Sequence, residues 1–157
     1  MITYKKGDMF AEDVEALVNP VNCVGVMGMG LALEFKKRFP ENFKMYKEVC
    51  VKEQLSPGGL HVYGLLESAN IGTDCSVNPK YIINFPTKMH WMHNSKRMDI
   101  ISSLHKLKEW IEQNKIKSIA IPALGCGLGG LDWDDVKLDI TMLLENANCE
   151  IVVFEPN

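Results

Sequence analysis

Two glycine-rich segments are the first candidates for binding chemistry. Residues 125–130 contain four glycines, and residues 24–30 contain glycine at positions 25, 28 and 30. Glycine lets the main chain approach an anion closely and point several N–H groups at it, because no Cβ stands in the way. Each segment comes before a helical pattern, where phosphates are commonly held. Two such loops facing each other would clamp a diphosphate, so the predicted ligand is a nucleoside diphosphate derivative.

Two carboxamides, Asn19 and Asn22, stand just before the first glycine segment. A carboxamide both donates and accepts hydrogen bonds, so Asn22 is predicted to hold sugar hydroxyls without adding charge beside a diphosphate. Asn19 can instead make a turn with Pro20 at the end of a strand, and we assign it mainly a structural role.

Lys88 is the candidate for the chemistry itself. It follows an apolar run at residues 81–85 and a Pro86-Thr87 turn, which places an amine at the same end of the predicted sheet as the glycine segments. Most lysines are solvated surface charges. Here, a lysine whose pKa is lowered could attack the ring-opened aldehyde of a ribose as a Schiff-base nucleophile, or it could protonate a leaving group.

Cysteine and aspartate side chains offer competing chemistry near the second glycine segment. Cys126 lies inside that segment, where main-chain dipoles could stabilise a thiolate, although packing of a small side chain explains it more simply. Asp132 is predicted to cap the helix that follows, with Asp134 and Asp135 adding favourable charge to its first turn. We therefore expect structural roles for these residues.

Asp8 and Phe154 stand at the ends of the first and last apolar runs. Asp8 could accept a hydrogen bond from the exocyclic amine of a base, or it could cap the next helical turn. Phe154 could stack on a base, or it could belong to the core. The residues alone leave both choices open.

Alternating strand and helix patterns position these groups. Strands are predicted at residues 2–5, 14–18, 60–66, 81–85, 118–124 and 150–154, and helices at residues 30–39, 41–53, 96–114 and 132–146. This alternation predicts an α/β fold with a largely parallel sheet covered by helices on both sides. Ligands bind such sheets outside the carboxyl ends of the strands, where both glycine segments fall. Residues 68–79 are predicted to form an exposed loop.

Composition limits the classes of protein. The chain has 157 residues, 46% of them hydrophobic and 24% charged, which suits one globular domain. A net charge of −3 gives no general attraction to nucleic acid, so such a contact would need a local patch such as residues 36–38. No apolar run is long enough to span a bilayer and no secretory segment opens the chain, which predicts a cytoplasmic protein without membrane contact.

Cysteine and histidine spacing argues against a metal site. The five cysteines form no C-x-x-C pair, so reduced thiols are expected in place of a disulfide framework or a structural zinc site. His90 and His93 lack an acidic or cysteine partner at a useful spacing. We expect no metal and no cofactor.

Four segments, in this order and spacing, resemble the macrodomain, the ADP-ribose-binding module: residues 6–10, 16–22, 25–32 and 119–130. The resemblance covers essentially the whole chain. It implies a single macrodomain over residues 1–157, a three-layer α/β/α sandwich around a mixed, mostly parallel central sheet. Residues 35–43 and 82–91 further resemble the DarG branch of the class that includes the human terminal ADP-ribose glycohydrolase. Proteins of that class remove ADP-ribose from thymidine bases of DNA or from acidic side chains, and DarG acts as antitoxin to the toxin DarT.

The resemblance also implies roles for individual residues. Asp8 would hold adenine, Phe154 would stack near it, Asn22 would orient the distal ribose, and Lys88 would be the catalytic lysine. Further ligand contacts are expected from the two loops and the segments beside them: Met9, Asn19, Gly25, Val26, Met27, Gly28, Gly30, Leu31, Pro86, Thr87, Gly125, Cys126, Gly127, Leu128 and Gly129.

The chain departs from the family pattern in several places. Met29 stands where the DarG pattern usually has a lysine, and Met89 and Met92 replace basic residues. Fewer cations mean fewer contacts with a phosphate backbone. Gly129 stands where the human glycohydrolase has a catalytic aspartate, so a Schiff-base pathway resolved by an aspartate is not expected. The chain also ends where the macrodomain ends, which is expected of a piece of a longer antitoxin or of a stand-alone relative.

These observations favour an ADP-ribosyl glycohydrolase that acts on thymidine in DNA or on acidic side chains of protein. Its expected partners are ADP-ribose, an ADP-ribosylated substrate such as single-stranded DNA carrying ADP-ribosyl-thymidine, and a DarT-like toxin. The alternatives are a reader module that binds ADP-ribose without turnover, and a hydrolase of a small ADP-ribose derivative. A dinucleotide oxidoreductase is disfavoured, because residues 25–30 do not form G-x-G-x-x-G.

Overall fold

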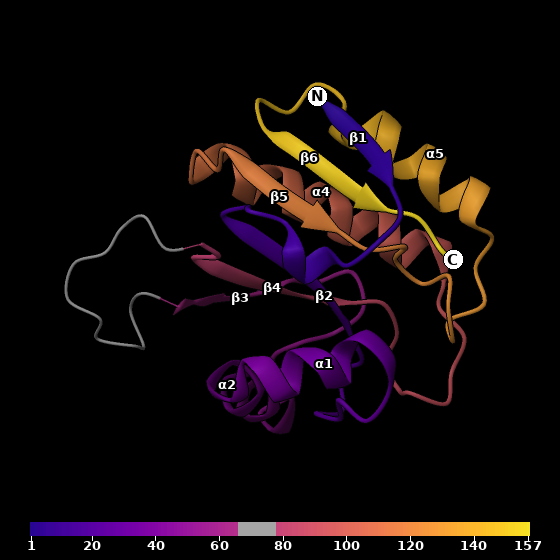
Figure 1. Cartoon of the computed structure of the whole chain (residues 1–157). Coiled ribbons are helices and arrows are strands. Elements are labelled where there is room, and N and C mark those ends of the chain that lie inside the picture. The colour runs from indigo at the N-terminus through magenta and orange to yellow at the C-terminus, as the bar shows by residue number, and fades with distance from the viewer. Residues whose placement is uncertain (66–77) are drawn as a thin grey trace.

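A six-stranded sheet forms the centre of the computed structural model, which describes residues 1–65 and 78–157 (Figure 1). The strands lie in the order β1-β6-β5-β2-β4-β3. Their bounds are β1 Ile2–Lys5, β2 Ala16–Val21, β3 His61–Gly64, β4 Tyr81–Pro86, β5 Ser118–Ile121 and β6 Glu150–Phe154. The edge strand β3 runs antiparallel to β4, and the other neighbours pair in parallel. The mixed, mostly parallel sheet is thus confirmed.

Helices cover both faces of this sheet (Figure 1). On one face lie α1 (Gly30–Arg38) and α2 (Pro40–Val51), and on the other lie α4 (Arg97–Gln113) and α5 (Trp133–Leu144). Pro40 occupies the first turn of α2, where its missing N–H costs nothing, and Asp132 caps α5 by accepting a hydrogen bond from Asp134 N at 2.8 Å. The three-layer α/β/α sandwich is the predicted architecture.

The core lies on both sides of the sheet because successive strand residues point to opposite faces. Leu17, Ile82 and Ala120 pack with Phe35 of α1 in one cluster. Their neighbours along the same strands, including Ala16, Ile83 and Ile119, pack with the apolar stripes of α4 and α5 in another. Strands buried on both faces explain the nearly continuous apolar runs in the sequence.

The strand boundaries differ from the sequence-based prediction where β2 and β5 end. β2 continues to Val21, whereas the Asn19-Pro20 pair had predicted a turn, because β2 pairs with β4 along all six residues. β5 stops at Ile121, before Pro122, rather than at residue 124. Between β2 and β5 only Ala16 and Leu17 are paired, so the two strands part toward their carboxyl ends. The separation of β2 from β5 opens a crevice between the carboxyl ends of these two strands.

The predicted exposed loop at residues 68–79 lies outside the described residues except at Asn78 and Pro79. The strand predicted at residues 60–66 is shorter in the structure and spans His61–Gly64. Among the described residues, no helix combines the length and apolar character needed to cross a bilayer.

Candidate functional site

A pocket of about 540 Å³ opens where β2 and β5 part. This size suits a small-molecule site. Its walls include eleven of the residues predicted to contact ligand: Asn22, Val26, Gly28, Gly30, Leu31, Thr87, Lys88, Gly125, Gly127, Leu128 and Gly129. The structure therefore brings the two glycine segments and the candidate lysine together at the carboxyl ends of the strands, as parallel-sheet geometry predicts.

The second glycine segment lines this pocket and contains unpaired N–H groups. Within it, Gly130 N donates to Gly127 O at 3.2 Å and Leu131 N donates to Gly125 O at 2.9 Å. Among the described residues, no acceptor lies against the backbone N–H groups of Gly125, Gly127, Leu128 or Gly129. Several unpaired N–H groups in one short loop form a cradle for an anion.

The first glycine segment ends in the N-terminus of α1, which supplies a second set of free N–H groups. The first intrahelical bond runs from Leu33 N to Met29 O at 3.3 Å, and no side chain caps the helix. The first turn of α1 also contains no acidic residue. Unpaired N–H groups and the positive end of the helix dipole therefore face the pocket at residues 28–32, and both favour an anionic ligand.

Asn22 holds the first glycine segment in shape. Its Oδ1 accepts hydrogen bonds from Val24 N at 3.1 Å and Val26 N at 3.4 Å, and its Nδ2 donates to Val26 O at 2.8 Å. The buried hydroxyl of Tyr46 on α2 donates to Asn22 as well. The carboxamide is thus engaged within the loop, and its contact with a ribose stays a prediction.

Asn19 belongs to a buried amide network below the pocket. Its Nδ2 donates to Oδ1 of Asn84 at 3.1 Å, and Asn84 in turn exchanges hydrogen bonds with Asn42 of α2 and lies 3.0 Å from Nδ1 of His61. Burial lowers the pKa of His61, which keeps the imidazole neutral within this network. The network joins β2, β4, β3 and α2, so the structural role assigned to Asn19 fits its position.

Lys88 is the one ionisable side chain among the described residues that line the pocket. It is half-buried, and desolvation lowers the pKa of its ammonium group below the usual value. No carboxylate in the described part of the chain forms an ion pair with it. A lysine in this setting carries a larger neutral fraction than a surface lysine and is the candidate nucleophile of the site.

The segment that carries Lys88 is hydrogen-bonded to the residues just before the first glycine segment and to the second glycine segment itself. At its start, Thr87 N donates to Val21 O at 2.9 Å and Cys23 N donates to Met89 O at 2.8 Å. At its end, Ser95 N donates to Gly129 O at 2.9 Å. The position of Lys88 is thus fixed relative to both walls of the anion cradle.

Several predicted ligand residues lie outside the pocket wall: Asp8, Met9, Asn19, Gly25, Met27, Pro86, Cys126 and Phe154. Asp8 caps the short 3₁₀ helix Met9–Ala11 by accepting a hydrogen bond from Phe10 N at 3.0 Å. Phe154 is 6% exposed and packs in the hydrophobic cluster that includes Phe35 of α1. Gly25, at φ 84°, packs against Lys47 of α2. Ligand contact for these residues stays a prediction.

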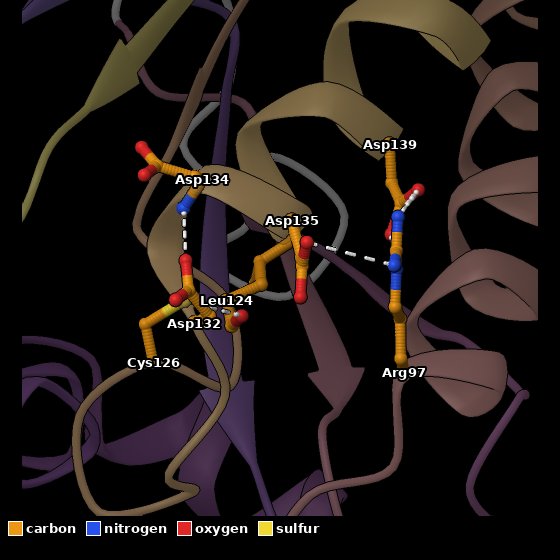
Figure 2. Close-up of polar contacts among 7 residues, drawn as sticks. All are labelled: Arg97, Leu124, Cys126, Asp132, Asp134, Asp135 and Asp139. Atoms are coloured by element: carbon orange, nitrogen blue, oxygen red, sulfur yellow. Dashed lines mark hydrogen bonds and ion pairs between the residues drawn. The ribbon is translucent and has the colours of Figure 1, made fainter.

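Cys126 is a poor nucleophile in this structure. Burial, with the nearby Asp132 carboxylate adding to it, raises the pKa of the Cys126 thiol to about 11. Its Sγ points to Leu124 O at 3.4 Å (Figure 2). Asp132 lies beside it as the cap of α5, which is the structural role predicted for this aspartate.

The same view shows how the start of α4 is fastened to α5. Arg97 donates from Nε and Nη2 to the two carboxylate oxygens of Asp139 at 2.8 and 2.9 Å, and it lies 3.7 Å from Asp135 (Figure 2). Two parallel bonds between a guanidinium and a carboxylate fix orientation as well as distance. This pair holds the helix that follows Ser95 in place beside the second glycine loop.

Gly129 has no room for a side chain. A Cβ at this position would lie 2.5 Å from Gly125 O and would also collide with Oγ of Ser95. Backbone atoms cannot move aside as the end of a flexible side chain can. An aspartate at this position would therefore require a different path of the loop.

Sequence reasoning missed part of the pocket wall: Pro20, Val21, Met29, Ala32, Trp91, Pro122 and Ala123. Four of them are the ends of β2 and β5 and the residues that follow, which the rule for ligand sites in parallel sheets could have identified. Trp91, Met29 and Leu128 are the large apolar lining residues that are more than half exposed, and we call these three residues the pocket mouth. No cluster of three or more metal-ligating side chains occurs in residues 1–65 and 78–157.

Comparison with known proteins agrees with this geometry. Residues 18–138 match the Macro domain family. The DNA ADP-ribosyl glycohydrolase of Mycobacterium tuberculosis is 42% identical over 158 residues, covering 100% of this chain and 43% of that protein. The solved macrodomain of M. tuberculosis DarG superposes with a TM-score of 0.91, covering 100% of this chain and 99% of that one.

Two further relatives extend the comparison. Thermosipho africanus DarTG, solved in complex with ADP-ribose, is 34% identical with a TM-score of 0.88, covering 99% of this chain and 41% of that one. A human ADP-ribose glycohydrolase is 28% identical over 157 residues, covering 98% of this chain and 90% of that protein. The chain spans less than half the length of the bacterial glycohydrolases it matches.

Proposed function

Because the chain belongs to the macrodomain family, we propose that it is an ADP-ribosyl glycohydrolase that removes ADP-ribose from thymidine in DNA. The observation that carries the proposal is the meeting of three elements in one pocket. These are the free N–H groups of Gly125, Gly127, Leu128 and Gly129, the uncapped N-terminus of α1, and the amine of Lys88. The first two suit a diphosphate and the third suits reaction at the sugar beyond it.

Backbone N–H groups make most of the proposed contacts with the diphosphate. Unpaired N–H groups on both walls neutralise the diphosphate without an arginine or lysine clamp, and Lys88 is left free for chemistry. The reaction that we propose requires no metal and no cofactor. A two-carboxylate glycosidase mechanism has no support here, since no carboxylate lines the pocket in the described part of the chain.

We assign nucleophilic catalysis to Lys88. Its neutral Nζ attacks C1″ of the distal ribose, and the bond from C1″ to the thymine nitrogen breaks. The leaving base takes the bonding electron pair and the proton that the attacking amine releases. Opening of the ribose ring converts the adduct to an imine, and water at C1″ then returns ADP-ribose and the free amine. The lowered pKa of Lys88 favours the first step because the attacking form is uncharged.

The thymidine substrate is favoured by the relatives and by the pocket mouth. The bacterial relatives at 41–42% identity are named DNA ADP-ribosyl glycohydrolases. Trp91 and Leu128, both more than half exposed, border the mouth and offer an apolar surface for a base. An acidic side chain attached to ADP-ribose would gain little from that surface.

A toxin partner and a cytoplasmic setting complete the proposal. One relative, from Thermosipho africanus, is named as a fusion of a DNA ADP-ribosyl transferase with a DNA ADP-ribosyl glycohydrolase. We therefore propose a DarT-like transferase as the source of the modified DNA. The free cysteines Cys23, Cys50, Cys126 and Cys149 suit a reducing compartment.

The test compares two substrates and two proteins. Wild type and Lys88→Ala are incubated with an oligonucleotide carrying ADP-ribosyl-thymidine and with a glutamate-ADP-ribosylated protein, and released ADP-ribose is measured. We expect release from the oligonucleotide by wild type and at least a hundredfold loss in Lys88→Ala, since general base or nucleophile removal costs on that order. Binding of ADP-ribose without release from either substrate would instead identify a reader module. Deacetylation of O-acetyl-ADP-ribose that survives the loss of Lys88 would identify a hydrolase of a small derivative.

A further inference from the structure

We propose that Ser95 is a positioning residue for the diphosphate loop, and that its hydroxyl donates a hydrogen bond to the carbonyl of Leu128 when the loop holds its anion. The proposal rests on the proposed function, because the anion is the diphosphate of ADP-ribose. Ser95 lies between Trp91 and α4, outside the pocket wall and against the back of the second glycine loop. It therefore acts through the loop and has no direct contact with the ligand.

The hydroxyl of Ser95 is buried and has no hydrogen-bond partner. The residue is 6% exposed, and its Oγ finds no donor or acceptor among the described residues. Burial of a hydroxyl without a hydrogen-bond partner is unfavourable, and native proteins contain few such groups. We therefore expect this hydroxyl to have a partner in another state of the protein. An orphaned hydroxyl at the back of an anion-binding loop points to the loop as its partner.

One peptide of the loop is free to turn toward this hydroxyl. The peptide between residues 129 and 130 is held at both ends, since Gly129 O accepts from Ser95 N at 2.9 Å and Gly130 N donates to Gly127 O at 3.2 Å. In the peptide between residues 128 and 129, by contrast, neither Leu128 O nor Gly129 N has a partner in the described part of the chain. Among the described residues, this peptide is restrained through the hydrogen bonds of its neighbours alone.

The geometry of a peptide links its two sides. The N–H and C=O of one planar trans peptide point in opposite directions. When the N–H of Gly129 turns to the diphosphate in the pocket, the carbonyl of Leu128 must turn to the back of the loop. Ser95 lies on that side, because its Oγ and Cβ stand where a Cβ of Gly129 or of Gly125 would meet them.

Gly129 makes this rotation possible. Turning the peptide between residues 128 and 129 changes φ of Gly129, and glycine tolerates values that other residues do not. The missing Cβ also leaves the space that Ser95 fills. Gly129 and Ser95 therefore act together to position the loop.

The experiment separates this role from a simple structural one. Binding of ADP-ribose to wild type, Ser95→Ala and Ser95→Cys is measured by calorimetry, and thermal unfolding is measured without ligand. For Ser95→Ala we expect a Kd raised about threefold to tenfold, the size of one neutral hydrogen bond, and an unfolding midpoint equal to or above that of wild type, because an unsatisfied hydroxyl is removed. Ser95→Cys keeps a side chain of similar shape but donates weakly, so it should also bind less tightly.

A control and a structure complete the test. Ser102→Ala, on the exposed side of α4, should leave both the Kd and the unfolding midpoint at their wild-type values. In a crystal structure of the ADP-ribose complex, Ser95 Oγ should lie about 2.7–3.0 Å from Leu128 O. A wild-type Kd in both Ser95 variants, or a Leu128 carbonyl that still faces away from Ser95 in the complex, would overturn the proposal. A wild-type protein that binds ADP-ribose but releases none from DNA would refute the glycohydrolase activity and leave the role of Ser95 standing.

Discussion

The hydroxyl of Tyr46 lies 2.7 Å from Oδ1 of Asn22 and 2.8 Å from its carbonyl oxygen. Tyr46 is wholly buried on α2, and Asn22 follows β2 at the base of the first glycine loop. Burial raises the pKa of Tyr46, so the hydroxyl stays protonated and acts as the donor. None of the described lining residues belongs to α2, yet that helix fixes the shape of the loop through this contact.

The contact predicts that Tyr46→Phe weakens ligand binding from a distance. Loss of the hydroxyl leaves the Asn22 oxygens with one donor fewer, which costs about 1–2 kcal/mol in unfolding free energy. The loop should lose order, and the Kd for ADP-ribose should rise severalfold in calorimetry. Tyr81→Phe is the matched control, because the Tyr81 hydroxyl makes no hydrogen bond within the described residues. Equal Kd values for Tyr46→Phe and wild type would contradict the role given to this pair.

Substitution of Lys88 by methionine should separate binding from chemistry. Lys88→Met keeps the length of the side chain, so ADP-ribose should still bind, while release from ADP-ribosyl-thymidine should fall at least a hundredfold. Borohydride added during turnover should trap ADP-ribose on Lys88 of the wild type, detected as a mass increase on the peptide that contains it. Full turnover without any trapped adduct would rule out the covalent step.

The rate should rise with pH through the lowered pKa of Lys88. The neutral amine attacks, and its fraction grows tenfold per pH unit below the pKa and levels off above it. Because burial places this pKa below the usual 10.5, the midpoint of the rise in single-turnover rate should lie below pH 10.5. A rate that falls over the same range would show that the ammonium form acts as an acid instead.

The order of elements and the location of the site could be predicted from sequence because both follow local patterns. Apolar runs mark buried strands, and strand ends in a parallel sheet meet at one edge, so the glycine segments and Lys88 were expected together. Tyr46 was missed because it sits on the buried stripe of α2 like any core residue. Its hydroxyl acquires a role only when α2 packs against Asn22.

Pairing between β2 and β4 also overrides the turn tendency of the Asn19-Pro20 sequence. Asn19-Pro20 is typical of a turn, yet β2 continues through it because β4 pairs with every residue to Val21. Proline is tolerated there because the pairing with β5 ends at Leu17. The crevice that becomes the pocket depends on this unequal pairing, which no pattern in β2 alone reveals.

Gly129→Ala should disrupt the second loop, whereas Gly127→Ala should not unfold it. A Cβ at position 129 would meet Gly125 O at 2.5 Å, while a Cβ at position 127 meets nothing within 4 Å. We expect Gly129→Ala to lower the unfolding free energy by about 1–3 kcal/mol, the usual cost of overpacking, and to weaken ADP-ribose binding. Gly127→Ala should unfold at the wild-type midpoint. Thermal unfolding with and without ADP-ribose distinguishes the two, and equal midpoints would contradict the packing seen around Ser95.

The composition of the pocket mouth predicts a weak dependence of DNA binding on salt. Met29, Trp91 and Leu128 border the mouth, and Lys88 is the one cation among the described lining residues. Each phosphate contact made by a cation contributes a slope of about −0.7 to log K against log salt for single strands. Binding of a catalytically inactive Lys88→Met protein to an oligonucleotide carrying ADP-ribosyl-thymidine should therefore show a slope near that of free ADP-ribose. Adding Met29→Lys to that variant restores the cation usual at this position in the DarG pattern, so it should tighten binding at low salt and steepen the slope by about 0.7. An unchanged slope would mean that the DNA backbone does not pass over Met29.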